Sequence, residues 1–141
     1  MLWFHPLLAA STTLLAFYVL CLGLVRLHGR HFGGTRHFHW KRHVRLGSLV
    51  MALWLLSFAG GALMVWLHWP EYFLKGGHSK GALNMLALMF LGLGTGWYMD
   101  RWPRQRVLLP LLHAAINIWL LVLALGQAVS GWGIVQKTLL H

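Results

Sequence analysis

The sequence predicts an all-α integral membrane protein whose four helices pack as one up-down bundle, with both termini on the outer side of the membrane. Of its 141 residues, 58% are hydrophobic and only 10% are charged, far from the balance of a soluble domain. Four stretches without Asp, Glu, Lys or Arg are each long enough to cross a hydrocarbon core of about 30 Å as a helix. They cover residues 6–25, 46–67, 81–99 and 107–136.

These stretches define the expected helices in order, within a single domain over 1–141. The first, at about 6–27, lacks the basic start and the cleavage pattern of a signal peptide, so we keep it as a helix. The second and third are expected at about 43–68 and 78–99, and the fourth, the longest, at about 105–135. The connections are short, which makes successive helices antiparallel neighbours. We expect no internal repeat beyond this alternation.

The basic residues predict the orientation of the bundle. Nine of the twelve fall in two connections on one side: Arg26, Arg30, Arg36, Lys41, Arg42, Arg45, Arg101, Arg104 and Arg106. By the positive-inside rule the connections 26–45 and 100–106 are cytoplasmic, in a bacterial inner or thylakoid-type membrane. Because the net charge of +10 sits between apolar spans, it indicates membrane topology and argues against nucleic acid as a partner.

Four of the ten histidines lie near the beginning of a helix, one in each helix. His5 and His78 open the first and third helices at the outer level. His43 and His113 lie near the start of the second and fourth helices at the inner level. In an up-down bundle alternate helices are diagonal, so the members of each pair face one another across the interior. The inner pair meets only if the second helix extends beyond its charge-free stretch or the fourth begins early.

Two facing neutral imidazoles are suited to the two axial positions of a low-spin haem iron. We therefore expect two haem b groups, one near each membrane face, held by the two histidine pairs. The chain has one cysteine, Cys21, and no Cys-x-x-Cys-His attachment motif, so these haems are expected to be noncovalent. Binding of one haem, or of none, stays open at this point, as does the substitution of His68 or His39 for a ligand.

Small and polar residues beside the histidines are candidate cofactor contacts. Gly47 and Gly81 follow the histidines of their own helices by four and three residues, so each leaves room on that face for a flat ring. Asn117 is expected to form a helix–helix hydrogen bond or, because it lies one turn from His113, to orient that histidine. Other side chains are expected either to neutralise haem propionates or to anchor the helix ends at the interface: Lys75, Ser79 and Lys80 outside, and Lys41, Arg42 and Arg45 inside.

Three short motifs resemble the cytochrome b561 family: His5-Pro6-Leu7-Leu8, Lys41-Arg42-His43 and His78-Ser79. That family has a four-helix core with two b-type haems. The stretch from 43–48 through 131–137 is similar to a bacterial branch of small four-helix membrane proteins, so the resemblance covers almost the whole chain. It implies that four histidines are the axial ligands, in the diagonal pairing: His5 with His78 and His43 with His113.

The expected function is transmembrane electron transfer by a di-haem b-type cytochrome. Two alternatives are a haem-poor structural anchor of a larger redox or photosynthetic complex, and a quinone-reactive cytochrome b subunit. Paired-carboxylate chemistry is excluded within one chain, because the only acidic residues, Glu71 and Asp100, are expected on opposite sides. An oxidoreductase subunit is therefore favoured over an enzyme that acts alone. The expected partners are the lipid bilayer, redox carrier proteins or quinone, and other subunits of a membrane complex.

Overall fold

The computed structural model describes residues 2–33 and 37–140, which confirm the expected all-α fold. Four long helices are α1 (Phe4–His31), α2 (Trp40–His68), α3 (Gly77–Arg101) and α4 (Leu108–Leu139). A short 3-10 helix, η1 (Pro70–Tyr72), lies in the connection between α2 and α3. No strand occurs in the described ranges.

The helices differ from the expected bounds mainly at the basic ends. Helix α1 extends to His31 and α2 already begins at Trp40, so both continue past the charge-free stretches. Long basic side chains permit this extension, because they carry their charges to water while the backbone stays helical. Helix α4 begins at Leu108 rather than near 105, which places Pro110 in its first turn, where a missing backbone N–H is tolerated.

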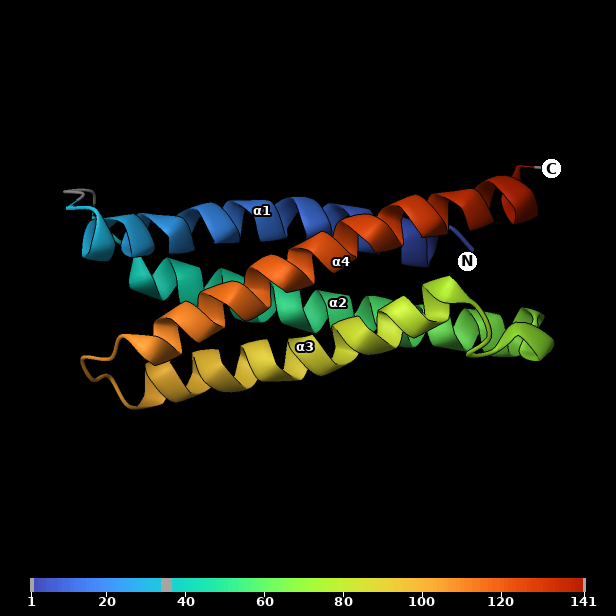
Figure 1. Ribbon diagram of the computed structural model, residues 1–141. Helices are drawn as coiled ribbons and strands as arrows, with labels where there is room; N and C mark the ends of the chain where they lie inside the picture. Colours follow the sequence, from blue (N-terminus) through green and yellow to red (C-terminus); the bar gives the residue numbers. More distant parts are fainter. Residues whose placement is uncertain (1, 34–36, 141) are drawn as a thin grey trace.

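The four helices form an up-down bundle in which successive helices are antiparallel (Figure 1). Helix α1 packs against α2 and α4, and α3 packs against the same two helices, so α1 and α3 are one diagonal and α2 and α4 the other. Both termini lie at one end with the connection 69–76, which we call the terminal end. The opposite end, with connections 32–39 and 102–107, is called the basic end. Arg36, one of the counted cations, lies outside the described residues.

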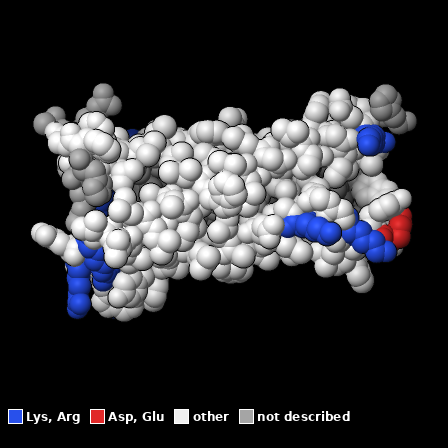
Figure 2. Space-filling view, in the orientation of Figure 1, with Lys and Arg blue, Asp and Glu red and all other residues white. Residues whose placement is uncertain are grey.

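Each of the four helices is long and apolar enough to span a membrane. Many large apolar side chains lie on the outside of the bundle, including Leu14 at 72% exposure and Val129 at 77%. On the face shown in Figure 2, the Lys, Arg, Asp and Glu side chains lie toward the two ends, and the middle of that face shows none of them. These features are those of an integral membrane protein whose outer surface contacts lipid.

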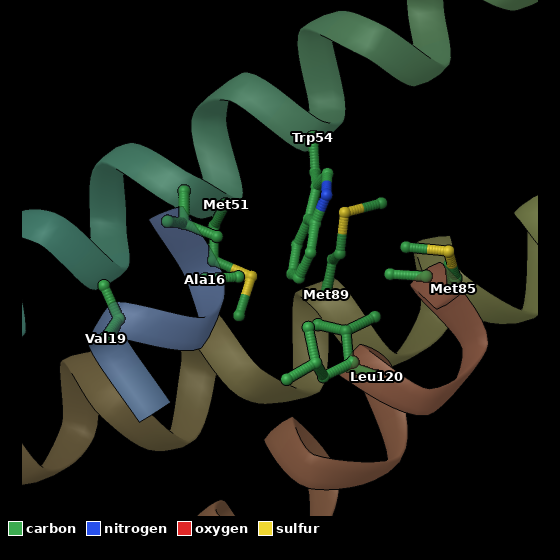
Figure 3. Packing of buried hydrophobic residues seen from close by; sticks show 10 residues of the cluster. Ala16, Val19, Met51, Trp54, Met85, Met89 and Leu120 are labelled. Atoms are coloured by element: carbon green, nitrogen blue, oxygen red, sulfur yellow. The ribbon is translucent and has the colours of Figure 1, made fainter. Parts of the chain in front are cut away.

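The core lies midway along the bundle and joins all four helices. Figure 3 shows Trp54 and Met51 of α2 facing Met89 of α3 and Leu120 of α4. The buried hydroxyl of Thr13 accepts a hydrogen bond from Trp54 Nε1–H at 3.4 Å and donates its own proton to the Ala9 carbonyl oxygen. The core is therefore apolar apart from a few satisfied hydroxyl groups.

Candidate functional site

The structure brings the four predicted histidines together in the predicted pairs. The ring centroids of His5 and His78 are 6.3 Å apart across the α1–α3 diagonal, with an interplanar angle of 84°. Those of His43 and His113 are 6.4 Å apart across the α2–α4 diagonal, with an angle of 76°. We call the first the terminal-end pair and the second the basic-end pair. The early start of α2, which carries His43 in its first turn, fulfils the condition for the basic-end pair to meet.

In the terminal-end pair, each Nδ1 atom bonds to the neighbouring antiparallel helix. His5 Nδ1–H donates to the Ser57 carbonyl oxygen at 2.8 Å. His78 Nδ1 lies 2.9 Å from Ser130 Oγ. Because the Ser130 hydroxyl donates its own proton to the Gly126 carbonyl at 3.0 Å, it accepts the bond from His78. Both rings are thereby assigned a proton on Nδ1 and a free lone pair on Nε2.

The basic-end pair repeats this arrangement. His43 Nδ1–H donates to the Val19 carbonyl oxygen at 3.2 Å. His113 Nδ1–H donates to Thr95 Oγ1 at 2.9 Å, because the Thr95 hydroxyl gives its proton to its own helix at Leu91. All four histidines are therefore oriented by Nδ1, the arrangement typical of metal-ligating imidazoles. Among the described residues, Nε2 of His5, His43 and His78 has no hydrogen-bond partner, whereas Nε2 of His113 lies 3.4 Å from Asn117 Nδ2.

Asn117 contacts His113 as expected. Its amide Nδ2–H donates to the His113 carbonyl oxygen at 2.7 Å, and Nδ2 lies 3.3 Å from Nδ1 of the same ring. The side chain therefore fixes this turn of α4 beside the basic-end pair.

Each of the four rings also packs against a glycine of the antiparallel neighbour, a contact with the histidines that was not among the expectations from the sequence. A Cβ atom built on Gly61 would lie 2.8 Å from Cε1 of His5. The corresponding distances at the other three sites are between 3.1 and 3.2 Å. The four glycine–histidine contacts are Gly61 with His5, Gly23 with His43, Gly131 with His78 and Gly96 with His113. A side chain at these positions would force the imidazole to move.

The glycines reveal an internal repeat, so the expectation of no repeat was wrong. If the histidine of a helix is position i, the glycine is position i+18 in every helix: 5 and 23, 43 and 61, 78 and 96, 113 and 131. This interval is five turns of about 3.6 residues each, so both lie on one face of the helix. Positions i+7 and i+11 are buried in all four helices: Thr12, Ala16, Val50, Trp54, Met85, Met89, Leu120 and Ala124. Each helix thus contributes a histidine to one site, a glycine to the other and core residues between them.

The donor set decides which metal group fits. Each site offers two imidazoles, and no cluster of three or more metal-ligating side chains occurs among the described residues. A bare zinc ion takes at least three protein ligands, whereas a haem iron needs only two, because the porphyrin fills the other positions. Two imidazoles on opposite sides of one metal place their centroids about 6 Å apart, given a bond of about 2 Å and a ring radius of about 1 Å. The observed centroid distances, 6.3 and 6.4 Å, match this spacing.

The other predicted contacts lie farther from the pairs. A Cβ on Gly47 would meet Val19 at 3.7 Å, and one on Gly81 would meet the Gln127 amide. Their role beside a cofactor stays a prediction. Three cations of the basic end line an opening of about 680 Å³ at the start of α2, together with His37 and His39. They are Lys41, Arg42 and Arg45. At the terminal end, Ser79 is half-buried beside His78, and Lys75 and Lys80 are exposed.

The two histidines considered as substitutes lie away from the pairs. His68 Nδ1–H donates to the Met64 carbonyl oxygen of its own helix at 3.0 Å, and the ring packs beside Trp69. His39 packs edge-on against His37, with ring centroids 5.1 Å apart. Neither ring is part of a diagonal pair in this structure.

Comparisons with protein-family models, with curated proteins and with solved structures find no match to this chain.

Proposed function

We propose that this chain is a b-type cytochrome that transfers electrons across a membrane through two noncovalent haem b groups, one near each face. The proposal depends on one observation: two histidine pairs on opposite diagonals, each at metal-bridging distance and each with Nδ1 engaged by a neighbouring helix. The resemblance to the cytochrome b561 family suggests the same ligands.

The residues of the chain have three tasks in this proposal. The four histidines would hold the iron through Nε2, and the Nδ1–H bonds to Ser57, Val19, Ser130 and Thr95 orient the rings and would make them better electron donors. The glycines let each imidazole lie close to the adjacent backbone. When bound, haem would supply one-electron redox chemistry at each site.

The core between the pairs separates the two sites. On each helix, the histidine of one site and the glycine of the other are separated by five helical turns, or about 27 Å along the axis. Met51, Trp54, Met89 and Leu120 fill the space between them. Among the described residues, this apolar packing offers no chain of titratable groups between the two sites, which supports transfer of electrons rather than protons.

The placement of the cations suggests the orientation. With the basic end in the cytoplasm, connections 26–45 and 100–106 are cytoplasmic and both termini are outside. This orientation suits a bacterial inner or thylakoid-type membrane. Redox carrier proteins or quinone would then supply and receive electrons at the two faces.

The experiment is a histidine variant series on the purified protein, read by haem content and by the reduced-minus-oxidised absorption spectrum. The wild type is expected to bind two haems per chain. His43→Ala and His113→Ala should each remove the same haem, and His5→Ala and His78→Ala the other. His68→Ala and His39→Ala are matched controls that should lose none. Protein without haem, or variants that do not fall into these two groups, would contradict the proposal and leave a structural anchor subunit as the better interpretation.

A further inference from the structure

A second opening at the basic end, which we call the arginine cavity, has a volume of about 320 Å³. All four helices line it, through Arg26, Trp40, Met99 and Pro110. Arg104 and Arg106 of the α3–α4 segment complete its wall. It is therefore an opening at the end of the bundle rather than a groove along one helix.

The cavity lies one helical turn beyond the basic-end pair. Arg26 and Met99 each follow a site glycine, Gly23 or Gly96, by three residues. Trp40 and Pro110 each precede a site histidine by three. Three residues are about one turn, and residues so spaced share a face, so the cavity lies on the same helix faces as the site, about one turn closer to the basic end.

The charge of this cavity is unbalanced. It has three arginines, while the whole chain has only two acidic residues against twelve lysines and arginines. Arg26 Cζ lies 5.3 Å from the centre of the Phe38 ring, and Arg106 Cζ lies 4.6 Å from that of Tyr98. Aromatic rings thus hold two guanidinium groups in place without neutralising them, which leaves their N–H donors available to a carboxylate.

Arg26 has no counterpart at the terminal end. In the internal repeat it occupies position i+21, counted from the histidine of its helix, and the same position in the other helices holds Met64, Met99 and Ile134. The repeat therefore makes the two sites alike in ligands and glycines but different in charge at this position. Three residues before the site histidine, the terminal end has Lys75 where the basic end has Trp40 and Pro110.

We propose that the arginine cavity binds the propionate carboxylates of the haem held by His43 and His113, with Arg26 as the main contact. This inference rests on the proposed function. It assigns the carboxylates to Arg26, Arg104 and Arg106 rather than to the cations nearest His43 in sequence. Residues one or two positions from a histidine do not share its helical face, which is why Lys41, Arg42 and Arg45 line a different opening.

The test measures haem affinity of the basic-end site alone, in protein that carries His78→Ala to remove the other site. Apoprotein is titrated with haem b and with its dimethyl ester, in which both carboxylates are masked. Arg26→Gln should weaken binding of haem b by about tenfold or more, the size of a lost charge-assisted hydrogen bond. It should leave binding of the ester nearly unchanged. Arg26→Lys, which keeps the charge, should restore much of the affinity for haem b.

Two controls separate this proposal from its alternatives. Arg101→Gln removes the same charge from the same end but from a residue outside the cavity, and it should have no effect. Equal weakening of haem b and ester by Arg26→Gln, or a larger effect from Arg45→Gln, would overturn the assignment. So would binding of inorganic phosphate to the haem-loaded protein through Arg26, because the cavity would then be open to free anions. If the wild type binds no haem, the proposed function fails as well. If the wild type binds haem and Arg26→Gln does not change the affinity, only this inference fails.

Discussion

At the scale of single residues, the closest contacts of the candidate site are those between glycine and histidine. A methyl group on Gly61 would lie 2.8 Å from Cε1 and 2.9 Å from Nδ1 of His5, closer than real Cβ atoms approach. The ring would have to shift, and its bond to the Ser57 carbonyl would be lost. The tolerance of the site for a single methyl group is therefore small.

Gly61→Ala is expected to weaken haem binding at the terminal end and to leave the basic-end haem in place. Overpacking of this kind costs roughly 1–3 kcal/mol. Gly94→Ala is the matched control, because a Cβ there meets no atom within 4 Å. Haem content and the absorption spectrum of the two variants would check this prediction. Retention of both haems in Gly61→Ala would show that the glycine is not needed.

The hydroxyl partners of the α3 and α4 histidines predict an effect on potential. Thr95→Val keeps nearly the same shape but removes the acceptor of the His113 Nδ1–H bond. The imidazole then donates less electron density, so the ferric form is less stabilised and the midpoint potential of the basic-end haem should rise. Redox titration measures this shift. Thr138→Val is the control: the Thr138 hydroxyl bonds to the Ile134 carbonyl of its own helix, away from both pairs, so this change should move neither potential.

The four histidines could be predicted from the sequence, because their level in the membrane follows from helix order and charge placement alone. The site glycines and Arg26 could not be assigned in the same way. Which face of α2 meets α1 depends on the rotation of each helix about its axis, and the weakly periodic apolar sequences do not define it. The constant interval from histidine to glycine, seen between His5 and Gly23 and again in the other helices, was the signal that could have identified the glycines.

At the scale of elements, the bundle consists of two helical hairpins, α1 with α2 and α3 with α4. Every glycine–histidine contact lies within a hairpin, whereas both histidine pairs join one hairpin to the other. The proposed haems would therefore act as two cross-links between hairpins that are already packed internally. This division of contacts predicts how the protein assembles.

Two fragments, split within the connection 69–76, should reassemble when expressed together and recover both haem spectra. Removing the ligands of one hairpin by His5→Ala with His43→Ala should reduce co-purification severalfold, because a ligand that binds only the joined hairpins stabilises their association. The control is the double variant His39→Ala with His68→Ala. It also removes two histidines from the α1–α2 fragment, but neither belongs to a pair, so it should not reduce co-purification. Unchanged association without the ligands would mean that lipid-facing packing alone joins the hairpins.

The existence and order of the helices could be predicted from the charge-free stretches, but their ends could not. Charge marks where a span meets water, whereas the backbone stays helical until proline, glycine or the connection ends it. Helix α2 therefore includes Lys41 and Arg42, which the expected start at 43 left out, and α4 begins only where Pro110 falls in its first turn.

At the scale of the whole molecule, the two ends of the bundle differ in charge. The chain has a net charge of +10, and nine of its twelve lysines and arginines belong to the segments 26–45 and 100–106 at the basic end. This asymmetry predicts the orientation, because positively charged connections are retained in the cytoplasm.

A fluorescent protein that matures only in the cytoplasm tests this orientation. Fused after the C-terminus, it should remain dark, and inserted in the connection 102–107 it should fluoresce. Replacing Arg101, Arg104 and Arg106 by Gln should weaken this preference. Fluorescence of the C-terminal fusion in the wild type would show that the basic end lies outside. The terminal-end pair would then lie near the cytoplasmic face, contrary to the proposed orientation.

The proposed di-haem cytochrome is tested most directly by the haem-to-protein ratio of the purified chain, together with the electron paramagnetic resonance spectrum of its oxidised form. We expect two haems per chain, both low-spin with two imidazole ligands. A colourless protein, or haem in a high-spin state with an open axial position, would contradict it.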